Sequence, residues 1–170
     1  RFNNDFKVPN FLKVPEPLIQ KQFSRIMSLK DGTKKMSKSD PSDLSRINLT
    51  DDKDKIINKI KKSKTDTMPM PSEEESLKNR PEVLNLLEIY SSLSNESVEK
   101  SKKEFSGKNF SDFKEKLSDL LVEKIEPISK EIKRLLNDEK NLDEILLEGT
   151  QKANKYASTK VKEMKKIIGF

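Results

Sequence analysis

The feature that most constrains this chain is a change of pattern near residue 50. Before it, four of the eight prolines interrupt short apolar runs at Phe11–Leu12, Leu18–Ile19 and Ile26–Leu29. After it, apolar residues recur at three- and four-residue spacing, as they do along one face of an α-helix. The first part therefore predicts loops with one or two short strands, and the second predicts a series of amphipathic helices.

Five helical regions are expected after that point, and together they should make up well over half of the chain. Thr50 is expected to cap the first, and Pro81 to lie in the first turn of the second. The third is expected from Ser97 to Phe105, the fourth is expected to be capped by Ser111, and the fifth is expected from Leu142 to Ile168. Pro127 should kink the fourth helix or divide it in two. The expected fold is mainly α, a helical bundle attached to the edge of an α/β domain.

The amino-acid composition excludes several classes of chemistry. The 170 residues include no cysteine and no histidine, which rules out disulfides, thiolate nucleophiles and Ser-His catalysis. We also expect no metal site built from protein ligands. No apolar run reaches the ~20 residues that a membrane helix needs. The composition therefore predicts a soluble, cytoplasmic protein without a membrane partner.

The charge balance gives a weaker indication. The net charge is +6, from 35 basic and 29 acidic residues. A basic excess favours a polyanionic partner such as nucleic acid or a nucleotide. A genome that encodes many surface lysines would produce the same excess without such a partner.

The segment most suited to chemistry is Lys34–Asp40, which follows the turn-forming Asp31-Gly32-Thr33. Lysine ammoniums and serine hydroxyls bind phosphate oxygens well, and a loop can close over a nucleotide. No glycine here has the Gly-x-x-x-x-Gly-Lys context of a P-loop. On residue types alone, an exposed loop without function is the commoner explanation.

The order of the residues points to a family. Lys35-Met36-Ser37-Lys38-Ser39 is letter for letter the KMSKS signature of class I aminoacyl-tRNA synthetases. The surrounding sequence resembles bacterial-type tryptophanyl-tRNA synthetases, and the resemblance covers essentially the whole chain. It is carried by Pro15–Ile19, Arg25–Leu29, Thr33–Asp40, Ser45–Leu49, Lys64–Asp66, Arg80–Tyr90 and Ile168–Phe170.

The resemblance implies an activity and a set of partners. Enzymes of this family activate tryptophan with ATP, release pyrophosphate, and transfer the amino acid from the adenylate to tRNA(Trp). Mg²⁺ is expected to accompany the ATP. The resemblance also implies a homodimer for the parent enzyme, whereas a monomer is expected for this chain alone.

The same resemblance assigns roles within the motif. Lys35 and Lys38 would be the catalytic residues and would contact the ATP phosphates, with Lys38 the stronger candidate for the leaving pyrophosphate. Ser37 and Ser39 would supply hydroxyl or backbone donors, and Met36 would anchor the loop against apolar neighbours.

One further ATP contact is implied outside the motif. A backbone contact to the adenine would come from Ile26, on the strand before the loop. A simple core position for Ile26 is an equally good interpretation.

The other signature of the class, a His-Ile-Gly-His element, has no counterpart in a chain without histidine. We therefore expect a C-terminal fragment that is inactive alone. Residues 1–49 would be the tail of the Rossmann-like catalytic domain. Residues 50–170 would form the helical, anticodon-binding-type domain that engages tRNA, with a last helix that returns to the catalytic domain.

Two alternative functions stay open. One is a tyrosine-specific synthetase of the same class, which the segment Arg80–Tyr90 opposes. The other is a non-catalytic helical RNA-binding or interaction module in which the loop match is accidental. Lysines between Lys53 and Lys64 and between Lys100 and Lys103 would contact phosphates or simply form solvated helix faces. Tyr90 and Tyr156 would stack on RNA bases or pack in the core, and their positions on apolar stripes favour the core.

Overall fold

The computed structural model describes residues 1–19, 23–72 and 76–170. The chain divides into two compact units, Gln20–Lys133 and Arg1–Ile19 with Arg134–Phe170. None of the described helices is both long and apolar enough to cross a membrane.

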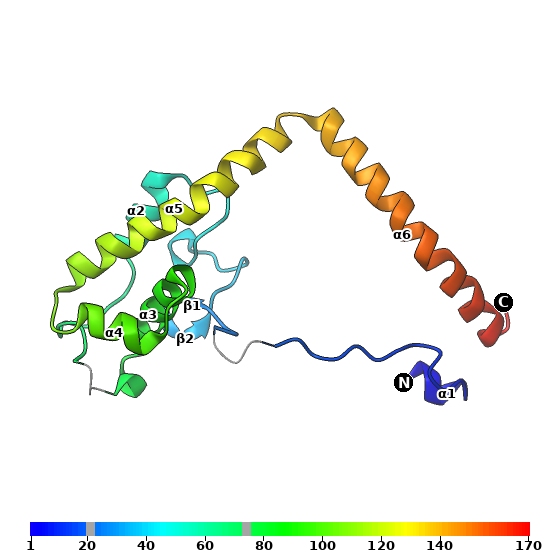
Figure 1. Ribbon diagram of the computed structural model, residues 1–170, viewed down its shortest axis with the longest axis horizontal. Helices are drawn as coiled ribbons and strands as arrows, with labels where there is room; N and C mark the ends of the chain where they lie inside the picture. The colour runs from blue at the N-terminus through cyan, green and yellow to red at the C-terminus, as the bar shows by residue number, and fades with distance from the viewer. Residues whose placement is uncertain (20–22, 73–75) are drawn as a thin grey trace. The chain divides into compact units, whose positions relative to one another are not determined.

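The elements that these residues form are labelled in Figure 1. The α-helices are α1 Phe2–Asp5, α2 Lys53–Lys61, α3 Pro81–Ser94, α4 Val98–Phe105, α5 Phe110–Leu136 and α6 Glu139–Ile168. Strands β1 Met27–Ser28 and β2 Asp31–Lys35 pair antiparallel, and Asp43–Ser45 and Leu77–Asn79 are 3-10 turns. Helices cover more than half of the chain, so the expectation of a mainly helical fold is confirmed.

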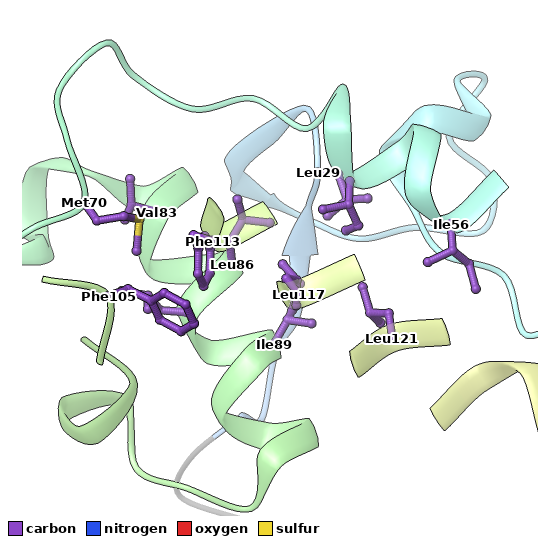
Figure 2. Packing of buried hydrophobic residues seen from close by; sticks show 12 residues of the cluster. Leu29, Ile56, Met70, Val83, Leu86, Ile89, Phe105, Phe113, Leu117 and Leu121 are labelled. Carbon is purple, nitrogen blue, oxygen red and sulfur yellow. The ribbon is translucent and has the colours of Figure 1, made fainter. Parts of the chain in front are cut away.

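One hydrophobic core holds the unit Gln20–Lys133 together (Figure 2). The Phe105 and Phe113 rings meet edge to face with their centroids 4.8 Å apart, and Tyr90 lies 5.0 Å from Phe105. Burying such large apolar side chains is the main driving force for folding. The buried members are Leu29, Ile56, Ile60, Met70, Val83, Leu86, Leu87, Ile89, Phe105, Phe113, Leu117 and Leu121.

Helix α3 lies at the centre of this unit. Pro81 occupies its first turn, where a missing N–H costs nothing, as the sequence predicted. The helix ends at Asn95, whose φ of 57° lies in the left-handed region that asparagine tolerates. Between these ends Val83, Leu86, Leu87 and Ile89 are buried, and the remaining apolar positions Leu84, Tyr90 and Leu93 are half-buried. This is the pattern expected for a helix packed on several sides.

Three helix starts differ from the prediction. Asp52, not Thr50, caps α2, and its Oδ1 accepts a hydrogen bond of 2.9 Å from the amide of Lys55. Helix α5 begins at Phe110, one residue before the expected Ser111 cap. Helix α6 begins at Glu139 and is capped by Asp138. In α2 and α6 the cap is the side chain that reaches the amide three residues further on, Lys55 for Asp52 and Asn141 for Asp138.

Helix α4 and the proline in α5 test two further expectations. The helix predicted from Ser97 to Phe105 forms as α4, and Ser97 caps it through a hydrogen bond of 3.2 Å from the amide of Lys100. Helix α5 runs through Pro127 as one helix, so division in two does not occur. Leu117 and Leu121, in the three turns before Pro127, are buried in the core. This packing holds the helix despite the lost backbone hydrogen bond.

Lys59 is an exception to the expected solvated lysine face. Its side chain is 2% exposed, and its Nζ lies 2.6 Å from Asp51 Oδ2 and 2.8 Å from Asp43 Oδ2. A buried ammonium requires such compensation, because leaving water is costly for a charge. The other lysines of this stretch are exposed, namely Lys53, Lys55, Lys61, Lys62 and Lys64.

The second unit has little buried surface of its own. The rings of Phe2, Phe6 and Phe11 cluster, with centroid separations of 4.8 and 5.8 Å from Phe2. The Lys160 ammonium lies 4.1 Å from the Phe11 ring centre. Within the described structure α6 has no buried residue, and Tyr156 is 80% exposed. The expectation that Tyr156 packs in the core is therefore wrong, whereas Tyr90 does pack there.

Candidate phosphate-binding loop

The KMSKS loop, Lys35–Ser39, begins on Lys35, the last residue of strand β2. In the hairpin, Met27 of β1 lies opposite Lys35, and Ser28 lies opposite Asp31. A backbone hydrogen bond of 3.0 Å from the amide of Met36 to the carbonyl of Ile26 extends the pairing by one step. The loop therefore begins at a fixed strand end.

The hairpin is attached to helix α3 by two contacts. The buried Asn85 carboxamide accepts a hydrogen bond of 2.8 Å from the Met27 amide and donates one of 2.9 Å to the Met27 carbonyl. This side chain pairs with β1 as a neighbouring strand would. At Gly32 a Cβ atom would come within 2.5 Å of the backbone of Pro81 and Glu82. Only glycine allows β2 to approach the start of α3 so closely.

Asp31 fixes the turn at the start of β2. Its Oδ1 accepts hydrogen bonds from the Thr33 hydroxyl at 2.6 Å and the Thr33 amide at 3.0 Å. The Lys34 ammonium lies 3.2 Å from its Oδ2. These bonds, with the Thr33 hydroxyl first, lower the pKa of Asp31 from 3.8 to about 2.

Inside the loop, side chains divide between the core and solvent. Met36 is half-buried and packs against the hydrophobic core. The Ser37 and Ser39 hydroxyls are 2.9 Å apart, and the Asp40 amide donates to the Ser37 carbonyl at 3.3 Å. The loop thus closes in a tight turn with Met36 pointing inward and the serines at the surface.

The two lysines of the motif are exposed, Lys35 at the end of β2 and Lys38 on the turn. Within residues 1–19, 23–72 and 76–170, neither the Lys35 nor the Lys38 ammonium has a hydrogen-bond or ion-pair partner. Two cations and two hydroxyls on one short loop are suited to several oxygens of a polyphosphate. The structure therefore presents all five motif residues on one segment, with the charged groups available to a ligand.

The segment after the loop is held by Arg46. Its Nη1 donates to the carbonyls of Asp40 at 2.9 Å and Ser42 at 3.3 Å. The Asp40 Oδ1 in turn accepts a hydrogen bond of 2.8 Å from the Ser42 amide. Both ends of the KMSKS loop are therefore attached to the folded unit, one through the hairpin and one through Arg46.

Sequence reasoning missed several residues that support the loop. Asn85 and Gly32 join the hairpin to α3, while Arg46 and Lys59 lie on the downstream side. An asparagine among leucines on a buried helix face was a visible signal, because a buried amide needs partners. Lysine spacing gave no signal that Lys59 is buried.

The family model for class I tRNA synthetases (W and Y) matches residues 1–126. The chain therefore belongs to this family of class I tRNA synthetases.

Within the family, the chain is homologous to bacterial tryptophan–tRNA ligases. That of Rhizobium meliloti is 52% identical over 155 residues, which are 91% of this chain and 44% of that protein. That of Brucella melitensis is 48% identical over 166 residues, or 98% and 47%. The Rickettsia felis protein is 50% identical over 159 residues, or 94% and 48%. These relatives favour the tryptophan alternative over the tyrosine one.

Solved structures agree with the fold. The crystal structure of tryptophanyl-tRNA synthetase from Mycoplasma pneumoniae matches 99% of this chain and 50% of that chain, with a TM-score of 0.82 and 28% identity. The Campylobacter jejuni enzyme, crystallised with ADP and tryptophan, shares the fold with a TM-score of 0.66 at 23% identity. The chain spans about half the length of the relatives that it matches.

Proposed function

We propose that this chain is the KMSKS-bearing part of a tryptophan–tRNA ligase, which activates tryptophan with ATP and transfers it to tRNA(Trp). The observation that carries the proposal is the exposed KMSKS loop, with both motif ammoniums unpaired within the described residues. Homology to tryptophan–tRNA ligases supports the choice of amino acid. We place the activity in the cytoplasm, where tRNA charging supplies translation.

Lys38 and Lys35 are the proposed catalytic groups. When the tryptophan carboxylate attacks the α-phosphorus, negative charge grows on the departing pyrophosphate. An ammonium aimed at those oxygens lowers the barrier more than it strengthens ground-state binding. Ser37 and Ser39 would donate hydroxyl or backbone hydrogen bonds to the same phosphates. Met36, packed on the core, would hold the turn that carries them.

The adenine contact proposed for Ile26 has a defined geometry. The Ile26 carbonyl already accepts the Met36 amide at 3.0 Å. The Ile26 N–H as donor, or the second lone pair of its carbonyl as acceptor, would make the contact to the adenine edge. Mg²⁺ would enter with the ATP, since phosphate oxygens are its preferred ligands.

A functional boundary near residue 50 remains part of the proposal. Residues 1–49 would belong to the catalytic domain and residues 50–170 to the tRNA-binding domain, whose last helix returns to the catalytic domain. Leu29 and Ile56 nevertheless belong to the same hydrophobic core. Within the unit Gln20–Lys133 the boundary is thus a division of function inside one packed core. A homodimeric parent enzyme and a monomeric isolated chain complete the proposal.

The decisive experiment is pre-steady-state adenylate formation by the full-length protein with saturating ATP and tryptophan. Lys38→Ala should lower the rate about a hundredfold, or roughly 3 kcal/mol, with little change in tryptophan affinity. Lys35→Ala should act in the same direction. Lys61→Ala, which removes an exposed lysine on α2, is the matched control and should leave the rate unchanged.

Two results would overturn the proposal. Adenylate formation at the wild-type rate by Lys38→Ala would remove the assigned role of the loop. Pyrophosphate exchange that depends on tyrosine rather than tryptophan would identify the other member of the family. The 170-residue chain alone should show no tryptophan-dependent exchange.

A further inference from the structure

A chain of charged contacts connects a buried lysine to the end of the KMSKS loop. The Lys59 Nζ lies 2.8 Å from Asp43 Oδ2. The other oxygen of that carboxylate, Asp43 Oδ1, lies 3.2 Å from Arg46 Nη2. Arg46 Nη1 donates to the carbonyl of Asp40, two residues after Lys38. Asp43 is therefore the bridge between the two cations.

The Lys59 end of this series of contacts is fixed. Lys59 belongs to α2, its side chain is 2% exposed, and its ammonium is also 2.6 Å from Asp51 Oδ2. Asp51 is itself buried and accepts the Asn48 amide at 2.8 Å. A buried ion pair with further hydrogen bonds has few alternative geometries. The Lys59 ammonium is thus a rigid reference point for Asp43.

Asp43, in the middle of this series of contacts, is open to solvent. The side chain of Asp43 is 57% exposed, whereas that of Arg46 is 18% exposed. The hydrogen bond from Lys59, followed by that from Asn48, lowers the pKa of Asp43. The carboxylate is consequently ionised across the neutral range and remains available to both cations.

We propose that Asp43 is a positioning residue for adenylate formation, which holds Arg46 against buried Lys59 so that the backbone after Lys38 is fixed. This inference rests on the proposed function of the loop. Asp43 would not touch the substrate. It would restrict the directions that the Lys38 ammonium can take.

The expected effect is on the rate rather than on binding. An ammonium that moves more freely can still meet ATP in the ground state. It less often meets the charge that develops on the pyrophosphate in the transition state. Loss of Asp43 should therefore lower the rate constant for adenylate formation and leave the substrate affinities nearly unchanged.

The test is a double-mutant cycle in the full-length protein, with adenylate formation measured at saturating ATP and tryptophan. Asp43→Ala should lower the rate about tenfold, with both KM values within twofold of wild type. Asp43→Asn, which keeps one oxygen acceptor, should recover part of the rate. Asp54→Ala removes another exposed carboxylate of the same stretch and should have no effect.

The cycle is completed in the Lys38→Ala background. If Asp43 acts through Lys38, Asp43→Ala should lower the remaining rate by less than twofold there. A full tenfold loss in that background, or no loss in the wild-type background, would overturn the inference while leaving the proposed function intact. A wild-type rate for Lys38→Ala itself would instead reject the proposed function.

Discussion

Helices α3 and α6 look alike in sequence and differ in how they are stabilised. Both carry apolar residues at helical spacing. In α3, six residues of the 14 are buried, whereas in α6 none of the 30 is buried within the described structure. Helix α6 is stabilised by local interactions. Asp138 caps its start, Gly169 ends it with a φ of 92°, and ion pairs such as Lys160–Glu163 lie along it. Periodicity therefore predicts that a helix forms but not what stabilises it.

The largest expected difference between the two helices concerns leucine truncation. Leu86 of α3 is 1% exposed and Leu146 of α6 is 59% exposed. Leu86→Ala should lower the free energy of unfolding by about 3 kcal/mol, because it removes buried methyl groups and leaves a cavity. Leu146→Ala should change it by less than about 0.5 kcal/mol. Equilibrium urea denaturation of the two variants measures both values, and equal losses would contradict the comparison.

Two glycine-to-alanine substitutions should change the free energy of unfolding in opposite directions. In Gly32→Ala, the new methyl group would lie 2.5 Å from the backbone at the start of α3. We expect a loss of about 1–3 kcal/mol from this overpacking. Gly149, inside α6, has no atom within 4 Å of an added Cβ. Gly149→Ala should stabilise α6 by about 0.5–1 kcal/mol through helix propensity.

Each glycine variant has its own measurement. Chemical denaturation reports the loss for Gly32→Ala, and amide hydrogen exchange across α6 should slow in Gly149→Ala. Destabilisation by both substitutions would mean that α6 is controlled by close packing, as α3 is.

The smallest effect is the pH dependence that Asp31 contributes beside α3. Its folded-state pKa of about 2 lies below the ordinary 3.8, so folding favours the ionised carboxylate. That stability is fully present above pH 4 and is lost as the pH falls through 2. Asp31→Asn should flatten the unfolding profile in this window. Thr33→Val, which removes the strongest donor, should raise the pKa of Asp31 in an NMR titration.

The sequence predicted helices well because a 3.6-residue period is a local property. It predicted helix starts less well, since Thr50 and Asp52 are both good caps and only geometry selects Asp52. Burial was harder still: Tyr90 and Tyr156 both lie on apolar stripes, and only Tyr90 meets other rings. Whether a side chain is buried depends on which other segments of the chain pack against its face of the helix.

For the candidate site, the motif identified the loop but not its supports. Residues Lys35–Ser39 are contiguous, so their order alone indicated a phosphate-binding loop. Asn85 bonds to Met27, 58 residues away in the sequence. Lys59 forms a buried ion pair with Asp51. Neither contact has a local pattern, so both needed the structure.

The Asn85 bridge to Met27 also has a consequence during synthesis. The ribosome adds roughly 5 to 20 residues per second, so it needs several seconds to add the 58 residues between these partners. Throughout that interval β1 has no carboxamide to complete its edge, and the nascent KMSKS segment is attached to an unfinished hairpin. A message truncated before the Asn85 codon would yield a polypeptide in which that edge stays unpaired.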